Sequence, residues 1–427
     1  MRTINLIGLD EKIYYDKCLN GLQIYVWVNE KINTFKGALV FKGGAENTEF
    51  YLDGKKRSVP NGTAHFLEHI MCKNNDGSSL LGKFNELNSY SNAATYPDKT
   101  IYEFVGTSNL YQNISLLLES TENKKFIKKY FEAERGPILE EARMRKDDAN
   151  RVFYYTLNNS LFHNYPNRIT GLGTLKDIKS IKIEDLKLFY QAFYHPKNSI
   201  LIITGNVDPI KVIDYVKKIQ NKLPITNYNK PKLKRFTEPN EVVLKFKEIK
   251  ANIEVPKITV AVKISCKSLP KKNIITILNI FQLVLLSNFG STSLLKEELL
   301  EKKLIINIGV SAELEREFII LKVSAKTKKP LEVKKIFEEK IQNLEIKEQD
   351  IFRKIKSEIA NLVLSFEDPD YVNDYLAYML VKYHKIIKNE KTILENITLK
   401  DVEEVMNLTK PLNYTTLIMY PLKKSDN

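Results

Sequence analysis

The sequence is poor in cysteine, histidine and tryptophan. Its 427 residues include only three Cys, five His and one Trp. The cysteines, Cys18, Cys72 and Cys266, lie far apart without a CxxC pair, which argues against a cysteine-based metal site and suits a reducing compartment. No apolar run approaches the roughly 18 residues of a membrane-spanning helix, and acidic residues come too early for a secretory signal. We therefore expect a cytoplasmic protein without a membrane span.

Basic residues are in excess, with a formal net charge of +14. They are spread along the chain, mostly as lysines with glutamates nearby, and no basic stretch is interleaved with aromatic residues. We interpret the charge as a solvated, lysine-rich surface and expect no nucleic-acid partner. Attraction of acidic peptides by electrostatic steering is the sharper alternative.

The two halves of the chain show the same order of strand and helix patterns. In the first half, β-branched and aromatic residues predict strands at 22–28 and 35–44. Residues 223–241 contain three prolines and no helical period, and therefore predict a linker. We expect an N-terminal domain at 1–222 and a C-terminal domain at 242–427. Both would be α+β, each a mostly antiparallel sheet covered by helices, and related by duplication.

Two of the five histidines lie four residues apart in the stretch GTAHFLEHI. Residues four apart share one face of a helix, so His65 and His69 can offer imidazole nitrogens to one metal ion. Glu68 points to nearly the same side and can reach a metal-bound water, in the inverse of the HExxH order. The alternative is an amphipathic surface helix that carries two histidines by chance, and the motif alone is a moderate signal.

Two histidines leave a hydrolytic zinc ion one ligand short, because such sites use three protein ligands and a water. The best source of a third ligand is the glutamate-rich segment 132–148, which is predicted to be helical. Glu134 and Glu141 lie seven residues apart and therefore share a face after two turns. Glu140 is an alternative ligand that points about 100° away around the helix.

Four stretches resemble the pitrilysin, insulinase and mitochondrial processing peptidase family in their order and spacing. They are GTAHFLEHIMCK, NSYSNAATYPDKTIYEF, ERGPILEEA, and the segment from GLGTLKDIKSI to SILIITGNVD. The resemblance covers essentially the whole chain and is densest over 12–208. Among small bacterial members, the chain is most similar to the zinc-bearing partner of paired peptidases, including those encoded beside peptide-bacteriocin genes. The resemblance implies two related domains that form one half of a clamshell peptidase.

The resemblance also implies roles for the residues of these motifs. His65, His69 and Glu141, which follows His69 by 72 positions, would bind one zinc ion per chain. Glu68 would be the general base that takes a proton from zinc-bound water. Glu134 would support the ligands without being one of them.

A substrate site is implied as well. Phe66 would line the pocket beside the scissile bond. Asn92 and Ala93 match the family's edge strand, to which the substrate backbone adds as an extra strand. Taken alone, Asn92 is also typical of a turn at the end of a strand.

One region departs from the self-sufficient members of the family. They carry an Arg and a Tyr shortly after a Gly/Ser-rich turn in the C-terminal half, and these residues hold the substrate carbonyl. The corresponding region here, 287–315, contains neither residue, and Arg316 fits the pattern poorly. Loss of such a donor costs about 10²–10³ in rate. We therefore expect a heterodimer with a related zinc-less subunit that supplies the Arg and Tyr, with a homodimer as the alternative.

The sequence thus predicts a subunit of a zinc-dependent endopeptidase that hydrolyses short, extended peptides. Peptide processing or turnover is the expected role, with a bacteriocin or leader peptide as one possible substrate. The alternative is a catalytically silent scaffold or binding subunit of the same fold. The presence of every implied ligand and of the base favours the peptidase.

Overall fold

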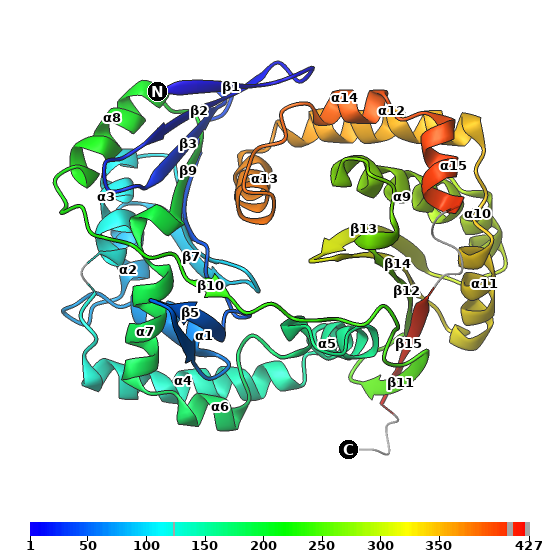
Figure 1. The fold of residues 1–427 in the computed structure, drawn as a ribbon, viewed down its shortest axis with the longest axis horizontal. Coiled ribbons are helices and arrows are strands. Elements are labelled where there is room, and N and C mark those ends of the chain that lie inside the picture. The colour runs from blue at the N-terminus through cyan, green and yellow to red at the C-terminus, as the bar shows by residue number, and fades with distance from the viewer. Residues whose placement is uncertain (123, 408–412, 423–427) are drawn as a thin grey trace. The chain divides into compact units, whose positions relative to one another are not determined.

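The chain folds into two compact units, each built from three separate stretches (Figure 1). The computed structural model describes residues 1–427 except 123, 408–412 and 423–427. The first unit comprises residues 1–144, 169–235 and 363–390, and the second comprises 145–168, 236–362 and 391–427. One division between the units falls after Arg235, inside the segment predicted as a linker. The sequence did not predict that 145–168 and 363–390 would each pack with the other half of the chain.

A seven-stranded sheet forms the frame of the first unit. Its strands are β1 (Arg2–Leu6), β2 (Glu11–Lys17), β3 (Gln23–Val28), β4 (Phe35–Phe41), β7 (Ser89–Thr95), β8 (Thr100–Gly106) and β9 (Ser199–Gly205). They lie in the order β1-β2-β3-β9-β4-β8-β7, and only the β3–β9 pair is parallel. The central strands β4 and β9 are buried along their whole length, and most of their residues are apolar.

A small second sheet completes the strands of this unit. It consists of β5 (Glu49–Leu52), β6 (Lys55–Ser58) and β10 (Lys232–Leu233), in the order β10-β5-β6. The start of the predicted linker therefore pairs with the first unit, because β10 lies within it.

Helices cover both faces of the large sheet (Figure 1). On one face, α3 (Leu110–Thr121) and α8 (Pro209–Gln220) contact the strands, and on the other, α13 (Pro369–Lys382) contacts β4 and β9. Lys36 of β4 is buried and lies 3.1 Å from Glu103 and 3.2 Å from Asp374 of α13. A buried lysine must be paired, so this cluster helps to hold α13 on the sheet. The other helices are α1 (Thr63–Met71), α2 (Leu80–Glu86), α4 (Lys128–Lys146), α6 (Leu175–Ser180) and α7 (Ile183–Phe193).

The second unit repeats the design with five strands. They are β11 (Phe246–Ala251), β12 (Lys257–Ser265), β13 (Asn307–Glu315), β14 (Phe318–Lys326) and β15 (Tyr414–Pro421). Their order is β11-β15-β12-β14-β13, with only β11 and β15 parallel. In the first unit, β3, β4, β7, β8 and β9 correspond in chain order to β11, β12, β13, β14 and β15 of the second unit. With this correspondence, the order β3-β9-β4-β8-β7 is the same as β11-β15-β12-β14-β13. This shared topology confirms the predicted pair of related α+β domains.

The helices of the second unit also pack against its sheet. Helix α9 (Ile274–Phe289) contacts β13 and β14, α11 (Pro330–Gln342) contacts β12, and α5 (Ala149–Leu161) contacts β15 and β11. By length and composition alone, the segment 274–301 could cross a membrane. However, 56% of its most apolar 18-residue stretch is buried inside the protein. That burial is typical of a core helix. The remaining helices are α10 (Leu294–Glu301), α12 (Glu348–Ser365), α14 (Glu390–Glu395) and α15 (Leu399–Asn407).

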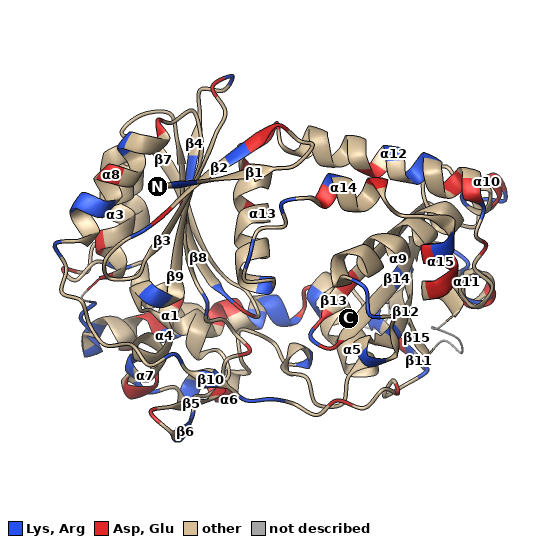
Figure 2. Ribbon diagram, turned by 45° about the horizontal axis from the view of Figure 1, so that its top comes forward, with Lys and Arg blue, Asp and Glu red and all other residues tan. Residues whose placement is uncertain are grey.

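Charged residues of both signs are interspersed on the helices. Figure 2 shows basic and acidic residues side by side on α8, α12 and α15. This mixture agrees with the interpretation of the net charge as a solvated surface.

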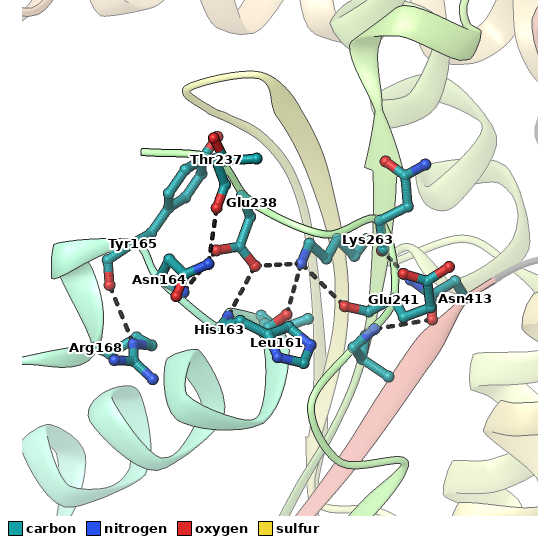
Figure 3. A network of polar contacts seen from close by, with 12 residues as sticks. Leu161, His163, Asn164, Tyr165, Arg168, Thr237, Glu238, Glu241, Lys263 and Asn413 are labelled. Atoms are coloured by element: carbon teal, nitrogen blue, oxygen red, sulfur yellow. Dashed lines mark hydrogen bonds and ion pairs between the residues drawn. The ribbon is translucent and has the colours of Figure 1, made fainter. Parts of the chain in front are cut away.

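A buried polar network fixes the end of the predicted linker within the second unit (Figure 3). Lys263 Nζ, on β12, lies 2.7 Å from Glu238 Oε1, and both side chains are 0% exposed. Lys263 Nζ also donates to the backbone oxygen of Leu161 at 2.9 Å. The Glu238 carboxylate accepts hydrogen bonds from the backbone nitrogens of His163 (2.8 Å) and Asn164 (2.7 Å). The network therefore joins the end of α5 to β12 through Glu238.

Candidate metal centre

Helix α1 presents the two histidines of the HFLEH motif. Gly62 precedes the helix with φ of 86°, a left-handed conformation that suits glycine. A Cβ at this position would lie 2.3 Å from the backbone oxygen of Leu172, so the approach also requires glycine. The ring centroids of His65 and His69 lie 4.6 Å apart. The helical spacing thus brings the two imidazoles together, as predicted.

Glu141, on α4, reaches both imidazoles. Its Oε2 lies 3.5 Å from His65 Nε2 and 3.4 Å from His69 Nε2. Two ligand atoms bonded to a tetrahedral zinc ion at about 2.1 Å lie about 3.4 Å apart. These two separations therefore fit a set of zinc ligands. Glu140, the alternative, is instead 62% exposed and pairs with Arg143 at 2.8 Å.

Glu68 lies beside the histidines and is buried. Ligand atoms of His65, Glu68 and His69 all lie within 4.8 Å of one another. Glu68 Oε2 accepts a hydrogen bond of 2.6 Å from Thr95 Oγ1. Burial raises the pKa of Glu68, although the Thr95 hydrogen bond and the charge of His69 oppose the rise. A carboxylate in this place can accept a proton during a reaction or contribute a further ligand.

Glu134 holds His69 through its other ring nitrogen. Glu134 Oε1 lies 3.0 Å from His69 Nδ1. Burial opposes a charge on the ring, but the hydrogen bonds with Glu134 and Glu141 raise the pKa of His69 to about 9. The hydrogen bond with His69 in turn lowers the pKa of Glu134. A carboxylate on Nδ1 orients the ring and leaves Nε2 for a metal ion, which is the supporting role predicted for Glu134.

Two contacts of the centre did not stand out in the sequence. Thr95 follows Ala93 by two positions, on the same face of β7, and its hydroxyl reaches Glu68. Lys73 follows His69 by four positions, and its Nζ lies 2.8 Å from Glu134 Oε2. Lys73 lies beyond the end of α1, so helical spacing does not point to it. For Thr95 no chemical motif existed, because its role depends on how β7 lies against α1.

Removal of the Lys73 charge should weaken zinc binding by about tenfold, because contacts to the partners of metal ligands typically contribute that much or more. In Lys73→Met, Glu134 loses the cation that positions its carboxylate on His69. Competition with a chromogenic chelator measures the affinity, and Lys73→Arg should restore it. Lys83→Met, which removes an exposed lysine 3.9 Å from Asp76, is the matched control. Equal affinity in Lys73→Met and this control would show that Lys73 does not act on the site.

Strand β7 is one of the two terminal strands of the first unit's large sheet. Asn92 lies on it, is exposed, and pairs with Glu103 of β8. Ala93 is the next residue, and Thr95, two residues further, contacts Glu68. A terminal strand carries unpaired N–H and C=O groups that can accept another strand. The candidate centre and an edge able to bind extended peptides are therefore neighbours.

Phe66 does not lie where the family resemblance placed it. Its side chain is 0% exposed and stacks on Phe131 with ring centroids 4.9 Å apart. Phe66 is one residue from His65, about 100° around the helix, and that rotation turns it into the core. In the structure, Phe66 is therefore a core residue and presents no exposed surface beside the candidate centre.

Arg316 has a packing role in the second unit. It lies in the turn between β13 and β14 with φ of 54°. Its guanidinium carbon lies 5.4 Å from the ring centroid of Tyr165 and 5.6 Å from that of Phe236. Cation–π contacts of this kind occupy the arginine within its own unit.

Two sequence models of one peptidase family match the chain. Residues 56–174 match "Insulinase (Peptidase family M16)", and residues 180–359 match "Peptidase M16 inactive domain". The first range contains His65, Glu68, His69 and Glu141.

Similar proteins with curated descriptions include zinc proteases. The chain is 29% identical to the uncharacterized zinc protease YmfH of Bacillus subtilis, over 95% of this chain and 96% of YmfH. It is 30% identical to the zinc protease PqqE of Helicobacter pylori, over 47% of this chain and 44% of PqqE. It is also 30% identical to a probable mitochondrial-processing peptidase subunit beta of Arabidopsis thaliana, over 38% of this chain and 32% of that protein.

Solved structures share the fold. An M16-like peptidase from Alicyclobacillus acidocaldarius superposes with a TM-score of 0.89 at 20% identity, over 98% of this chain and 100% of that one. Pitrilysin superposes with a TM-score of 0.74 at 18% identity, over 99% of this chain and 46% of that one.

Proposed function

The chain belongs to peptidase family M16, and we propose that it is the zinc-bearing subunit of an endopeptidase that hydrolyses short, extended peptides. The observation that carries the proposal is the position of Glu141 Oε2, 3.5 and 3.4 Å from the Nε2 atoms of His65 and His69. Several similar proteins are named zinc proteases, which supports zinc as the metal.

The residues of the centre divide the work of hydrolysis among them. His65, His69 and Glu141 would hold one zinc ion, which when bound polarises a peptide carbonyl and makes water a stronger acid. Glu68 accepts the proton of the attacking water and delivers it to the leaving amine. Burial raises the pKa of Glu68, which suits a group that must hold a proton between these steps. Glu134 keeps His69 oriented throughout.

The substrate would bind as an additional strand along β7. Asn92 and Ala93 would hold the peptide backbone by main-chain hydrogen bonds, a mode with weak side-chain selectivity. Strand addition requires an extended substrate, so we expect short peptides to be cleaved in preference to folded proteins. Bacteriocin and leader peptides belong to this class. A cytoplasmic location is part of the proposal and fits the free cysteines Cys18, Cys72 and Cys266.

A related subunit without the HxxEH motif would complete the site. Residues 287–315 contain no Arg or Tyr, and Arg316 packs on Tyr165 and Phe236 within the second unit. The partner would supply the donors that stabilise the charge on the scissile carbonyl. Similar proteins named as beta subunits of the mitochondrial processing peptidase are, by that name, parts of a larger enzyme. A homodimer is the alternative assembly.

Peptide hydrolysis followed by mass spectrometry tests the proposal. The purified chain is assayed alone and then mixed with a related chain of similar length encoded by a neighbouring gene. We expect the mixture to be at least about 10²-fold more active than the chain alone, because the oxyanion donors come from the partner. Full activity of the chain alone would contradict the need for a partner. Absence of hydrolysis in both samples would favour a silent scaffold.

A further inference from the structure

A cavity of about 220 Å³ lies in the first unit, away from the candidate metal centre. The residues that line it come from α3, α8, the strands β4 and β9, and the segment 223–226. None of His65, Glu68, His69 and Glu141 lines it. It is therefore a separate site on the same unit, and the proposed peptidase chemistry does not use it.

The carboxylate of Glu122 lines this cavity, and two buried amide side chains lie next to it. Glu122 directly follows α3, and its Oε1 accepts a hydrogen bond from Gln220 Nε2. Gln220 Oε1 in turn accepts a hydrogen bond of 2.8 Å from Asn20 Nδ2. Asn20 and Gln220 are both buried, with exposed fractions of 3% and 1%. Two buried amides thus form a chain that ends on the carboxylate and fixes its position.

Among the residues that the structure describes, no cation balances this carboxylate. Among the described residues that line the cavity there is neither Lys nor Arg, and Glu122 forms no ion pair within the described part of the chain. His195 is the one basic side chain in the described lining, and burial lowers its pKa. Burial also raises the pKa of Glu122. Glu122 is half-buried, and a partly desolvated carboxylate without a countercharge is unfavourable. A cationic ligand would therefore gain from supplying that charge.

The rest of the lining is suited to a short apolar body. Leu39, Phe41 and Leu118 are buried and face the cavity together with Tyr190 and Tyr194. Aliphatic side chains bury hydrocarbon groups, and aromatic rings attract ammonium groups. The volume is below the roughly 300–1,000 Å³ that is usual for drug-sized ligands. Among the described lining residues there is no Lys or Arg that could pair with a carboxylate of the ligand. A zwitterionic amino acid is therefore disfavoured.

One wall of the cavity is held by a specific contact. Leu223, Pro224 and Thr226 line it, and His195 Nε2 lies 2.8 Å from Thr226 Oγ1. The His195 ring also stacks on Tyr228, with ring centroids 4.4 Å apart. His195 therefore fixes the beginning of the predicted linker over the cavity.

We propose that this cavity binds a small primary amine in its ammonium form. The ammonium group donates hydrogen bonds to the Glu122 carboxylate, and a short hydrocarbon chain packs against Leu39, Phe41 and Leu118. The chemistry identifies the ligand as a compact alkylamine or diamine. Binding is independent of zinc and of peptide hydrolysis, so failure of one proposal leaves the other intact.

Titration calorimetry on the full chain tests this proposal, with n-butylammonium as the probe and n-butanol as its neutral counterpart. We expect saturable binding of n-butylammonium, at least about tenfold tighter than that of n-butanol, because only the former makes a charge-assisted hydrogen bond. Glu122→Gln should weaken amine binding by about tenfold or more. Glu86→Gln, which changes an exposed acid on α2, is the control and should bind like the wild type.

Circular dichroism confirms that each variant folds, and Glu122→Gln is expected to fold because it removes an unpaired, half-buried charge. A rise in the thermal midpoint with n-butylammonium, present in wild type and lost in Glu122→Gln, would support the proposal independently. Equal binding of the amine and the alcohol would overturn it. So would unchanged amine affinity in Glu122→Gln, or no saturation of the wild type at millimolar amine.

Discussion

Replacement of Glu68 by glutamine should lower peptide hydrolysis by about 10²–10⁴-fold, the usual contribution of a general base. An amide cannot accept the proton of water. It has nearly the shape of the carboxylate, and its oxygen can still accept the hydrogen bond from Thr95 that Glu68 accepts at 2.6 Å. The zinc content should therefore stay at the wild-type value. Hydrolysis is measured by mass spectrometry in the active mixture, and zinc by elemental analysis.

Glu140→Gln is the control for this experiment. Glu140 is adjacent to Glu141 on α4, but its side chain is 62% exposed and pairs with Arg143. Hydrolysis and zinc content should both be unchanged in this variant. Zinc loss in Glu68→Gln would make Glu68 a ligand, and full activity would remove it from the chemistry.

Replacement of Lys263 by methionine should lower the free energy of unfolding of the second unit by about 3–5 kcal/mol, the usual cost of breaking a buried ion pair. Lys263 and Glu238 are 2.7 Å apart, and neither side chain is exposed. Burial opposes ionisation of Glu238, but donation from Lys263 and from two backbone N–H groups lowers its pKa. Without the lysine, a carboxylate is left buried without its cation. Since single domains are stable by only about 5–15 kcal/mol, this change is large.

Urea unfolding measures the effect on the second unit. The double variant Lys263→Met/Glu238→Gln should recover part of the lost stability, because no unpaired charge remains in it. Lys267→Met is the control: its side chain is 82% exposed, and surface changes of this kind usually shift stability by less than about 0.5 kcal/mol. If Lys263→Met proves no more costly than Lys267→Met, the network does not stabilise the unit.

The sequence predicted those parts of the site that depend on helical spacing. His65 and His69 are one turn apart on α1, and Glu134 and Glu141 are two turns apart on α4, so each pair had to share a face. The structure brings both faces together, with Glu134 on one nitrogen of His69 and Glu141 on the other. Phe66 was assigned by resemblance alone, and its rotation away from His65 on the helix places it in the core.

Features that depend on packing between distant segments could not be predicted in this way. No pattern in the sequence predicts that 145–168 joins the second unit or that 363–390 joins the first. The first is fixed by the hydrogen bond between Lys263 and Leu161, which lie 102 residues apart. The second is fixed by Lys36 and Asp374, which lie 338 residues apart. Such pairs show no periodicity within one element. The order of strands in the two sheets was likewise visible only once long-range pairing was known.

Anomalous diffraction at the zinc absorption edge, from crystals of the zinc-loaded chain, tests the central claim most directly. The account predicts one zinc ion per chain, bonded to His65 Nε2, His69 Nε2 and a Glu141 carboxylate oxygen at about 2.0–2.2 Å, with Glu68 outside the ligand set. An ion bound by His65, Glu68 and His69 without Glu141, or an ion bound elsewhere, would contradict it.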